Sequence, residues 1–112
     1  LDGVGSRLVL QQACEEAGIP MVHGAISGWY GQVSTIFPGE RTLSIIYSGF
    51  ENRNTDNRLG NPSFTPALTA SLQVSEALKI MISRGSLLRG RIMFINTYDN
   101  SVDIAELSKR QI

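Results

Sequence analysis

The sequence has little of several residue types, and each shortage excludes a class of protein. The only cysteine, Cys14, excludes an internal disulfide and favours a reducing compartment, so we expect a cytoplasmic protein. With a single histidine, His23, the usual cysteine and histidine spacings of a zinc site are absent. Ten basic residues balance ten acidic ones, whereas nucleic-acid-binding proteins usually carry a basic excess. No apolar run approaches the roughly 18 residues of a membrane span. We therefore expect neither a nucleic-acid partner nor a membrane.

The composition is that of a globular chain, and the first residues suggest part of a larger domain. Hydrophobic residues make up 42% of 112 residues, which is typical of a folded protein. Residues 1–7 read as the end of a buried strand that runs directly into a helix. Because no earlier strand is present to pair with it, we expect residues 1–112 to be the C-terminal half of an α/β domain.

The first predicted helix covers residues 7–17. Ser6 is placed to cap its start, and Gly18 followed by Pro20 is typical of a helix end. Helical spacing predicts one apolar face, made of Leu10, Ala13, Cys14 and Ala17. A strand predicted over residues 21–26 follows closely, which favours a βαβ unit with a parallel sheet.

The rest of the chain alternates predicted strands with one long helix. Further strands are predicted over residues 29–37, 42–47, 91–96 and 102–107. Residues 48–62 are polar and rich in asparagine, which predicts a long loop.

The second predicted helix starts at Thr65–Pro66 and runs to about Arg84, before Gly85. Its apolar stripe comprises Ala67, Ala70, Val74, Ala77, Leu78 and Met81. This stripe predicts burial at a sheet or at a subunit interface. The overall prediction is an α/β fold with a mixed sheet and two main helices.

Few residues are candidates for chemistry. Asp2 follows a presumed parallel strand, at the edge where open α/β sheets place ligands, so it is a candidate to hold Mg²⁺ on a nucleotide; the alternative is a helix-capping aspartate. Cys14 lies on a predicted apolar helix face and is expected to be inert. His23 lies inside an apolar strand and is expected to be a hydrogen-bonded structural residue. Neither the G-x-G-x-x-G nor the P-loop pattern is present.

Several motifs, in order along nearly the whole chain, resemble the ThiF/MoeB/HesA family, bacterial relatives of ubiquitin-activating enzymes. Residues 2–7 resemble its D-N-x-x-[ST]-R segment, and residues 28–33 are similar to its G-F-x-G-Q-V motif. Residues 70–79 resemble S-x-Q-A-x-E-A-x-K, and residues 90–94 resemble the G-R-L-L-x-F strand.

The resemblance implies a Rossmann-like fold that uses ATP and Mg²⁺ to adenylate the C-terminal Gly-Gly carboxylate of a small ubiquitin-like or sulfur-carrier protein. By family position, Asp2 lies at the Mg·ATP site, and the family's usual state is a homodimer. The nucleotide-binding half precedes these residues in the family. The fragment alone is therefore expected to be inactive, although its parent is expected to be an adenylyltransferase.

Departures from the family leave alternatives open. Gly3 replaces the asparagine that follows the aspartate, and the C-x-x-C pairs that bind zinc are missing near residues 42–47 and at the C-terminus. We therefore expect no zinc and, with no thiol in residues 54–61, no covalent transfer to cysteine. The alternatives are a non-catalytic ThiF-like scaffold or carrier-protein binding module, and an unrelated dinucleotide-binding oxidoreductase.

Overall fold

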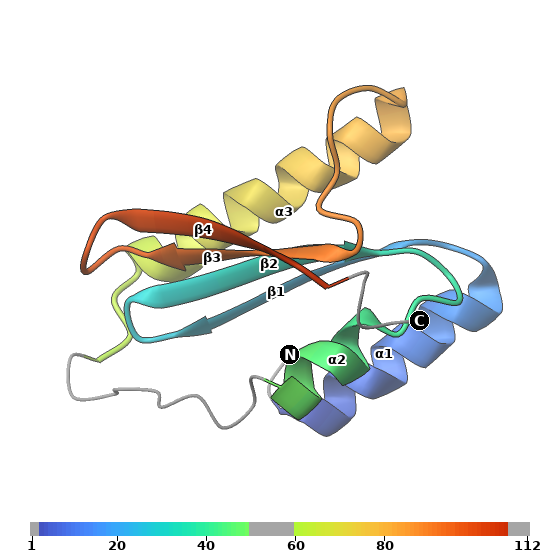
Figure 1. Ribbon diagram of the computed structural model, residues 1–112, viewed down its shortest axis with the longest axis horizontal. Coiled ribbons are helices and arrows are strands. Elements are labelled where there is room, and N and C mark those ends of the chain that lie inside the picture. The colour runs from blue at the N-terminus through green and yellow to red at the C-terminus, as the bar shows by residue number, and fades with distance from the viewer. Residues whose placement is uncertain (1–2, 50–59, 108–112) are drawn as a thin grey trace.

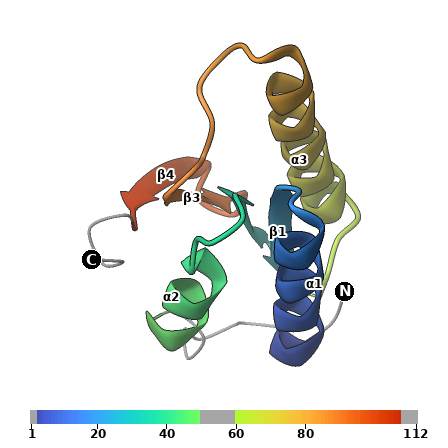
Figure 2. The same cartoon turned by 90° about the vertical axis from the view of Figure 1, so that its right-hand side faces the viewer.

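The computed structural model describes residues 3–49 and 60–107, which form a sheet with helices on both faces (Figure 1). The elements in chain order are α1 (Val4–Ala17), β1 (Met21–Ser27), β2 (Tyr30–Ile36), α2 (Thr42–Gly49), α3 (Phe64–Ile82), β3 (Arg91–Asn96) and β4 (Ser101–Glu106). Helix α3 lies along one face of the sheet, over β1 and β2, and α1 and α2 lie on the other side (Figure 2). The predicted α/β class with two main helices is confirmed, and α2 is added.

The four strands form one sheet in the order β1-β2-β3-β4, and every neighbouring pair is antiparallel. The β1–β2 turn includes Gly28 at φ 61°, and the predicted turn between β3 and β4 has Asn100 at φ 57°. Such tight turns can join only antiparallel strands. The sheet is therefore antiparallel and not mixed as predicted, and parallel pairing among the described residues is limited to one isolated bridge between Thr35 in β2 and Arg89, before β3. The predicted parallel βαβ unit involves residues 1–2, which lie outside the described residues.

Residues 42–47 form a helix, so the strand predicted there is wrong. Thr42, Leu43 and Ile46 are fully buried, at i, i+1 and i+4, and thus share one face of α2. This face packs against Met21 and Ile36 in the larger hydrophobic cluster. A short apolar run fits a strand and a helix equally well, and its packing partner decides between them. Of the predicted 48–62 loop, residues 48–49 end α2, residues 60–62 precede α3, and residues 50–59 lie outside the described residues.

Helix α1 begins earlier than predicted and turns a different face inward. Gly3 at φ 84° is its N-cap, so Ser6 lies inside the helix and is not the predicted cap. Gly18 adopts the left-handed conformation expected of a helix end. The residues turned away from solvent are Val4, Arg7, Gln11 and Cys14, whereas the predicted face member Leu10 is 39% exposed. The inward face therefore carries polar groups beneath the sheet.

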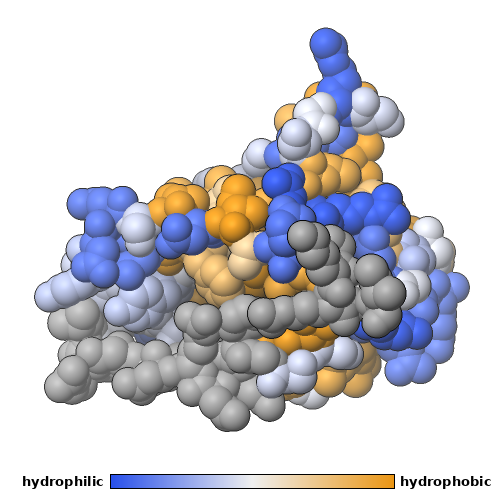
Figure 3. All heavy atoms as spheres, viewed as in Figure 1, coloured by the Kyte–Doolittle hydropathy of each residue, from blue (hydrophilic) through white to orange (hydrophobic). Residues whose placement is uncertain are grey.

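Helix α3 contacts the sheet through polar side chains, which contradicts burial of its apolar stripe against the sheet. Thr65, Thr69 and Glu76 are its buried residues, whereas Leu78 is 54% and Met81 is 79% exposed. Apolar residues are visible along α3 in Figure 3. Burial of this stripe at a subunit interface, the other predicted location, stays a prediction.

The polar inner face of α3 follows from two glycines in the strands beneath it. A Cβ added to Gly31 would collide with the Thr69 hydroxyl, and one added to Gly24 would collide with the Gln73 side chain. The missing side chains let short or hydrogen-bonding groups of α3 reach the sheet. Gln73 Nε2 uses this space to donate a hydrogen bond to the Val22 carbonyl, at 3.2 Å.

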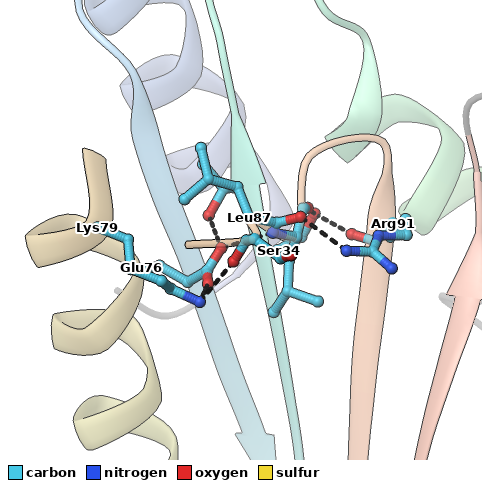
Figure 4. A network of polar contacts seen from close by, with 8 residues as sticks. Ser34, Glu76, Lys79, Leu87 and Arg91 are labelled. Atoms are coloured by element: carbon cyan, nitrogen blue, oxygen red, sulfur yellow. Dashed lines mark hydrogen bonds and ion pairs between the residues drawn. The ribbon is translucent and has the colours of Figure 1, made fainter. Parts of the chain in front are cut away.

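A buried carboxylate joins α3 to the sheet and to the segment before β3 (Figure 4). The Oε1 atom of Glu76 accepts hydrogen bonds from Thr35 Oγ1 and from the Leu88 backbone N–H, both at 2.6 Å. Its Oε2 atom forms an ion pair with Lys79, whose Nζ also donates to the Ser86 carbonyl at 2.6 Å. Both carboxylate oxygens are thus used to hold residues 86–88 against the helix.

The pKa of Glu76 reflects two opposing effects, burial of the carboxyl and its polar contacts. Burial alone would raise the pKa of the carboxyl, but the hydrogen bond from Leu88, together with Lys79 and Thr35, outweighs it and lowers the pKa below its ordinary value. Beside it, Ser34 donates to the Arg91 carbonyl at 2.6 Å, which ties the start of β3 to β2.

Candidate functional site

A pocket of about 520 Å³ lies on the face of the sheet opposite α3. Its floor consists of two rows of residues that are neighbours in register across all four strands. The first row is Ala25, Gln32, Phe94 and Asp103, and the second is Ser27, Tyr30, Asn96 and Ser101. The start of α1 contributes Gly3, Val4 and Arg7 to the wall, and α2 contributes Ile46 and Tyr47. Its size is typical of pockets that bind small molecules or short peptide segments.

The two charged side chains among the described lining residues stand at opposite ends of the pocket. Arg7 lies at the β1 side, where its Nη1 donates a hydrogen bond to the Gly24 carbonyl at 2.8 Å. Asp103 lies on β4, the other edge of the sheet. Between them the floor offers hydroxyl and amide groups. The arrangement suits an extended molecule with a negative group at one end and a positive group further along.

His23 lies beside this site, two residue pairs beyond the first row of the floor and on the same face of the sheet, and is buried. Neither ring nitrogen has a hydrogen-bond partner in the described part of the chain, so the predicted hydrogen-bonded role is wrong. The ring instead meets Tyr47 edge-on, with centroids 6.0 Å apart. Burial, reinforced by the charge of Arg7, lowers the pKa of His23 to about 4. The imidazole is therefore neutral at pH 7 and supports packing.

Of the other two predicted site residues, the structure describes only Cys14. Asp2 lies outside the described residues, but its neighbour Gly3 lines the pocket. Cys14 is half-buried and packs against the hydrophobic cluster on the inner side of α1, away from the pocket. The role of Asp2 remains a prediction, and the packing of Cys14 agrees with an inert thiol.

Sequence reasoning missed the polar floor and its acidic end. Asn96, Ser101 and Asp103 belong to the β3–β4 hairpin, whose strands were predicted without a register. The turn signal at Asp99–Asn100 was the available clue, because a short hairpin turn sets which residues face each other. Pairing from that turn brings Asp103 opposite Phe94.

The described residues do not by themselves fit a magnesium nucleotide. No group of three or more histidine, cysteine, aspartate or glutamate side chains within residues 3–49 and 60–107 is placed to hold a metal ion. The pocket lining there contains one arginine and no lysine, whereas phosphate chains are usually gripped by several cations or by a glycine-rich loop. In the same ranges, no helix has the length and apolar character needed to cross a bilayer.

Comparisons with solved structures extend the fold assignment. The crystal structure of PaaA matches with a TM-score of 0.67 at 10% identity, covering 92% of this chain and 33% of that one. The structure of Escherichia coli MccB with AMPCPP and MccA matches with a TM-score of 0.62 at 10% identity, covering 88% and 32%. At such identities the likeness concerns the fold.

Sequence comparisons identify the family. SAMP-activating enzyme E1 of Haloferax volcanii is 29% identical over 101 residues, covering 88% of this chain and 37% of that protein. A probable molybdopterin-synthase adenylyltransferase of Pyropia yezoensis is 31% identical over 105 residues, covering 89% and 28%. The chain thus spans about a third of these relatives or less. The ThiF family matches over residues 1–111, and the chain belongs to the ThiF family.

Proposed function

We propose that this chain is the substrate-binding part of an ATP-dependent adenylyltransferase that activates the C-terminal carboxylate of a ubiquitin-like or sulfur-carrier protein. The observation that carries the proposal is the pocket, whose wall begins at Gly3, directly after Asp2. Related proteins with adenylyltransferase or activating-enzyme names support the reaction class.

We assign nucleotide binding to residues outside the described ranges. Among them, Asp2 is the proposed ligand of the Mg²⁺ ion that accompanies the nucleotide. The pocket contributes one cationic side chain, Arg7, near the place where the substrate carboxylate has to lie. In this division, the described residues bind and orient the protein substrate. The chain by itself is expected not to turn over ATP.

Replacing Asp2 with asparagine in the intact protein is expected to lower ATP–pyrophosphate exchange at least about a hundredfold, because a metal ligand and its charge are lost. The matched control is Glu16→Gln, which removes one negative charge from an exposed position on α1. If the Asp2→Asn variant catalyses ATP–pyrophosphate exchange at the same rate as the Glu16→Gln control, Asp2 does not belong to the site.

A non-catalytic scaffold that binds the carrier protein is the second candidate. Two observations favour it: Gly3 replaces the family's asparagine, and the described pocket lacks a phosphate-binding set. An intact protein that binds a Gly-Gly-tailed carrier but catalyses no exchange at any ATP concentration would establish this candidate over the first.

The homodimer expected from the family resemblance has a structural candidate in α3. On its outer face, Val74 is 66% and Leu78 is 54% exposed. Contiguous exposed apolar residues often mark a protein–protein interface. The double substitution Val74→Lys and Leu78→Lys is expected to raise the dimer dissociation constant at least about tenfold, measured by analytical ultracentrifugation.

The control for the dimer combines Gln12→Lys with Glu16→Gln, which together raise the net charge by the same two units at exposed positions on α1, across the sheet from α3. This variant is expected to dimerise like the unmodified protein. A monomeric unmodified protein at tens of micromolar, or equal dissociation constants for all variants, would contradict an interface through α3.

A further inference from the structure

We propose that hydrophobic burial holds α2 to the end of β4, at the place where the family resemblance implies a structural zinc ion. The two C-x-x-C pairs of the family would fall near residues 42–47 and at the C-terminus, and the sequence has neither pair. Leu43 and Ile46 on α2 and Leu107, which follows β4, make the connection in their place. The connection is independent of the proposed adenylation.

The side chains around α2 do not supply the ligands of a zinc ion. A structural zinc site usually has four ligands, mostly cysteine sulfurs and histidine nitrogens, and the sequence contains one cysteine and one histidine. Cys14 packs against the larger hydrophobic cluster, and the ring of His23 meets that of Tyr47 edge-on. Carboxylates do not complete the set, because no group of three or more histidine, cysteine, aspartate or glutamate side chains in the described ranges could hold a metal ion. Within the described residues, zinc therefore has no site beside α2.

A hydrophobic contact is present there instead. Six buried side chains from α2, three strands and the end of β4 form the larger hydrophobic cluster: Met21, Ile36, Leu43, Ile46, Ile92 and Leu107. None of them is more than 7% exposed, and Leu43 and Ile46 are fully buried. Each aliphatic side chain removed from water stabilises the fold, so this contact can hold α2 without a bound ion.

Backbone pairing fixes Leu107 in this contact. Its N–H donates a hydrogen bond to the carbonyl of Gly90, directly before β3, at 2.7 Å. Ala105, two positions earlier, packs against the same cluster, as expected for alternate residues of a strand. The pairing of β4 with β3 therefore determines which residues reach the cluster.

The connection also positions one wall of the pocket. Helix α2 contributes Ile46 and Tyr47 to the lining; Ile46 belongs to the cluster and Tyr47 packs against it. A helix held by zinc is released when a chelator removes the metal or when its cysteines are oxidised. Neither treatment acts on contacts between aliphatic side chains, so this wall is expected to keep its place in the presence of chelators and oxidants.

The test compares the thermal unfolding of variants of the intact protein. Leu107→Ala is expected to lower the midpoint temperature by at least about 5 °C, because it leaves a cavity in the cluster. The decrease should be equal in excess EDTA and in excess zinc sulfate. The matched control is Leu10→Ala, which removes the same atoms from a position on α1 that is 39% exposed. This control is expected to change the midpoint by less than about 2 °C.

Hydrogen exchange measures where the loss acts. In Leu107→Ala, the backbone amides of residues 42–49 in α2 are expected to exchange at least about tenfold faster than in the unmodified protein. The amides of residues 64–82 in α3 should change much less, because α3 contacts the sheet away from this cluster.

Two kinds of result would overturn the proposal. If Leu107→Ala and Leu10→Ala unfold at the same midpoint, or if the amides of α2 and α3 accelerate equally, Leu107 does not hold α2. If EDTA lowers the midpoint of the unmodified protein and Cys14→Ser abolishes this effect, a metal ion makes the connection.

Discussion

Replacing Glu76 with alanine is expected to lower the free energy of unfolding by about 3–5 kcal/mol. The carboxylate is 2% exposed and is the acceptor for both Thr35 Oγ1 and the Leu88 backbone N–H. Its removal leaves these donors buried without a partner, and the charge of Lys79 without its ion pair. Urea unfolding followed through the only tryptophan, Trp29, measures the change.

The control separates the hydrogen bonds from the charge. Both hydrogen bonds end on the same oxygen, so Glu76→Gln can keep them and lose only the ion pair. Its cost is expected to be about half that of the alanine variant. If Glu76→Ala unfolds within about 1 kcal/mol of the unmodified protein, the carboxylate does not hold α3 to residues 86–88.

Lowering the pH from 6.5 to 4 is expected to reduce the free energy of unfolding by about 3 kcal/mol through His23 alone. The pKa of His23 is about 4 in the folded protein, against an ordinary 6.5, because of burial and then Arg7. Between these values the unfolded chain binds a proton that the folded chain does not, so stability falls as the pH falls. Above pH 6.5 the imidazole is neutral in both states and contributes no slope.

The variant His23→Phe isolates this effect, because an aromatic ring of similar shape can keep the edge-on contact with Tyr47. Urea unfolding at a series of pH values should give a flatter profile for the variant between pH 4 and 6.5. The pKa of Glu76 is lowered, so its contribution to stability is present above its ordinary pKa of 4.5 and is lost as the pH falls below it. Both proteins carry Glu76, so this loss is common to them and cancels in the comparison. Identical slopes in the two proteins would contradict a buried, neutral His23.

Element types were predictable wherever a long periodic pattern or a strong turn signal was present. Residues 91–96 form β3 as predicted, and Gly18 ends α1 as predicted. Residues 42–47 were misread because a short apolar run has no period of its own. An element was therefore predicted correctly where the local spacing of residues determines its structure, and wrongly where tertiary packing determines it.

Helix orientation and the site depended on tertiary contacts that spacing does not encode. The apolar stripe of α3 predicts an inward face, yet Gly24 and Gly31 make room on the sheet for polar groups such as Gln73. The candidate Asp2 came from its place after a presumed strand and from the family resemblance. Asp103 emerged only when the register placed it in one row with Phe94 and Gln32.

The close fit of α3 over the two glycines also limits how this chain can diverge. Gly31 and Thr69 occupy one shared volume, as do Gly24 and Gln73, so a larger side chain at either strand position requires a smaller one on the helix. Sequence drift at these sites is therefore accessible mainly through coordinated double changes. Among related sequences, residues at positions 31 and 69 should therefore vary together, and so should residues at positions 24 and 73, because the helix lies so close to the sheet.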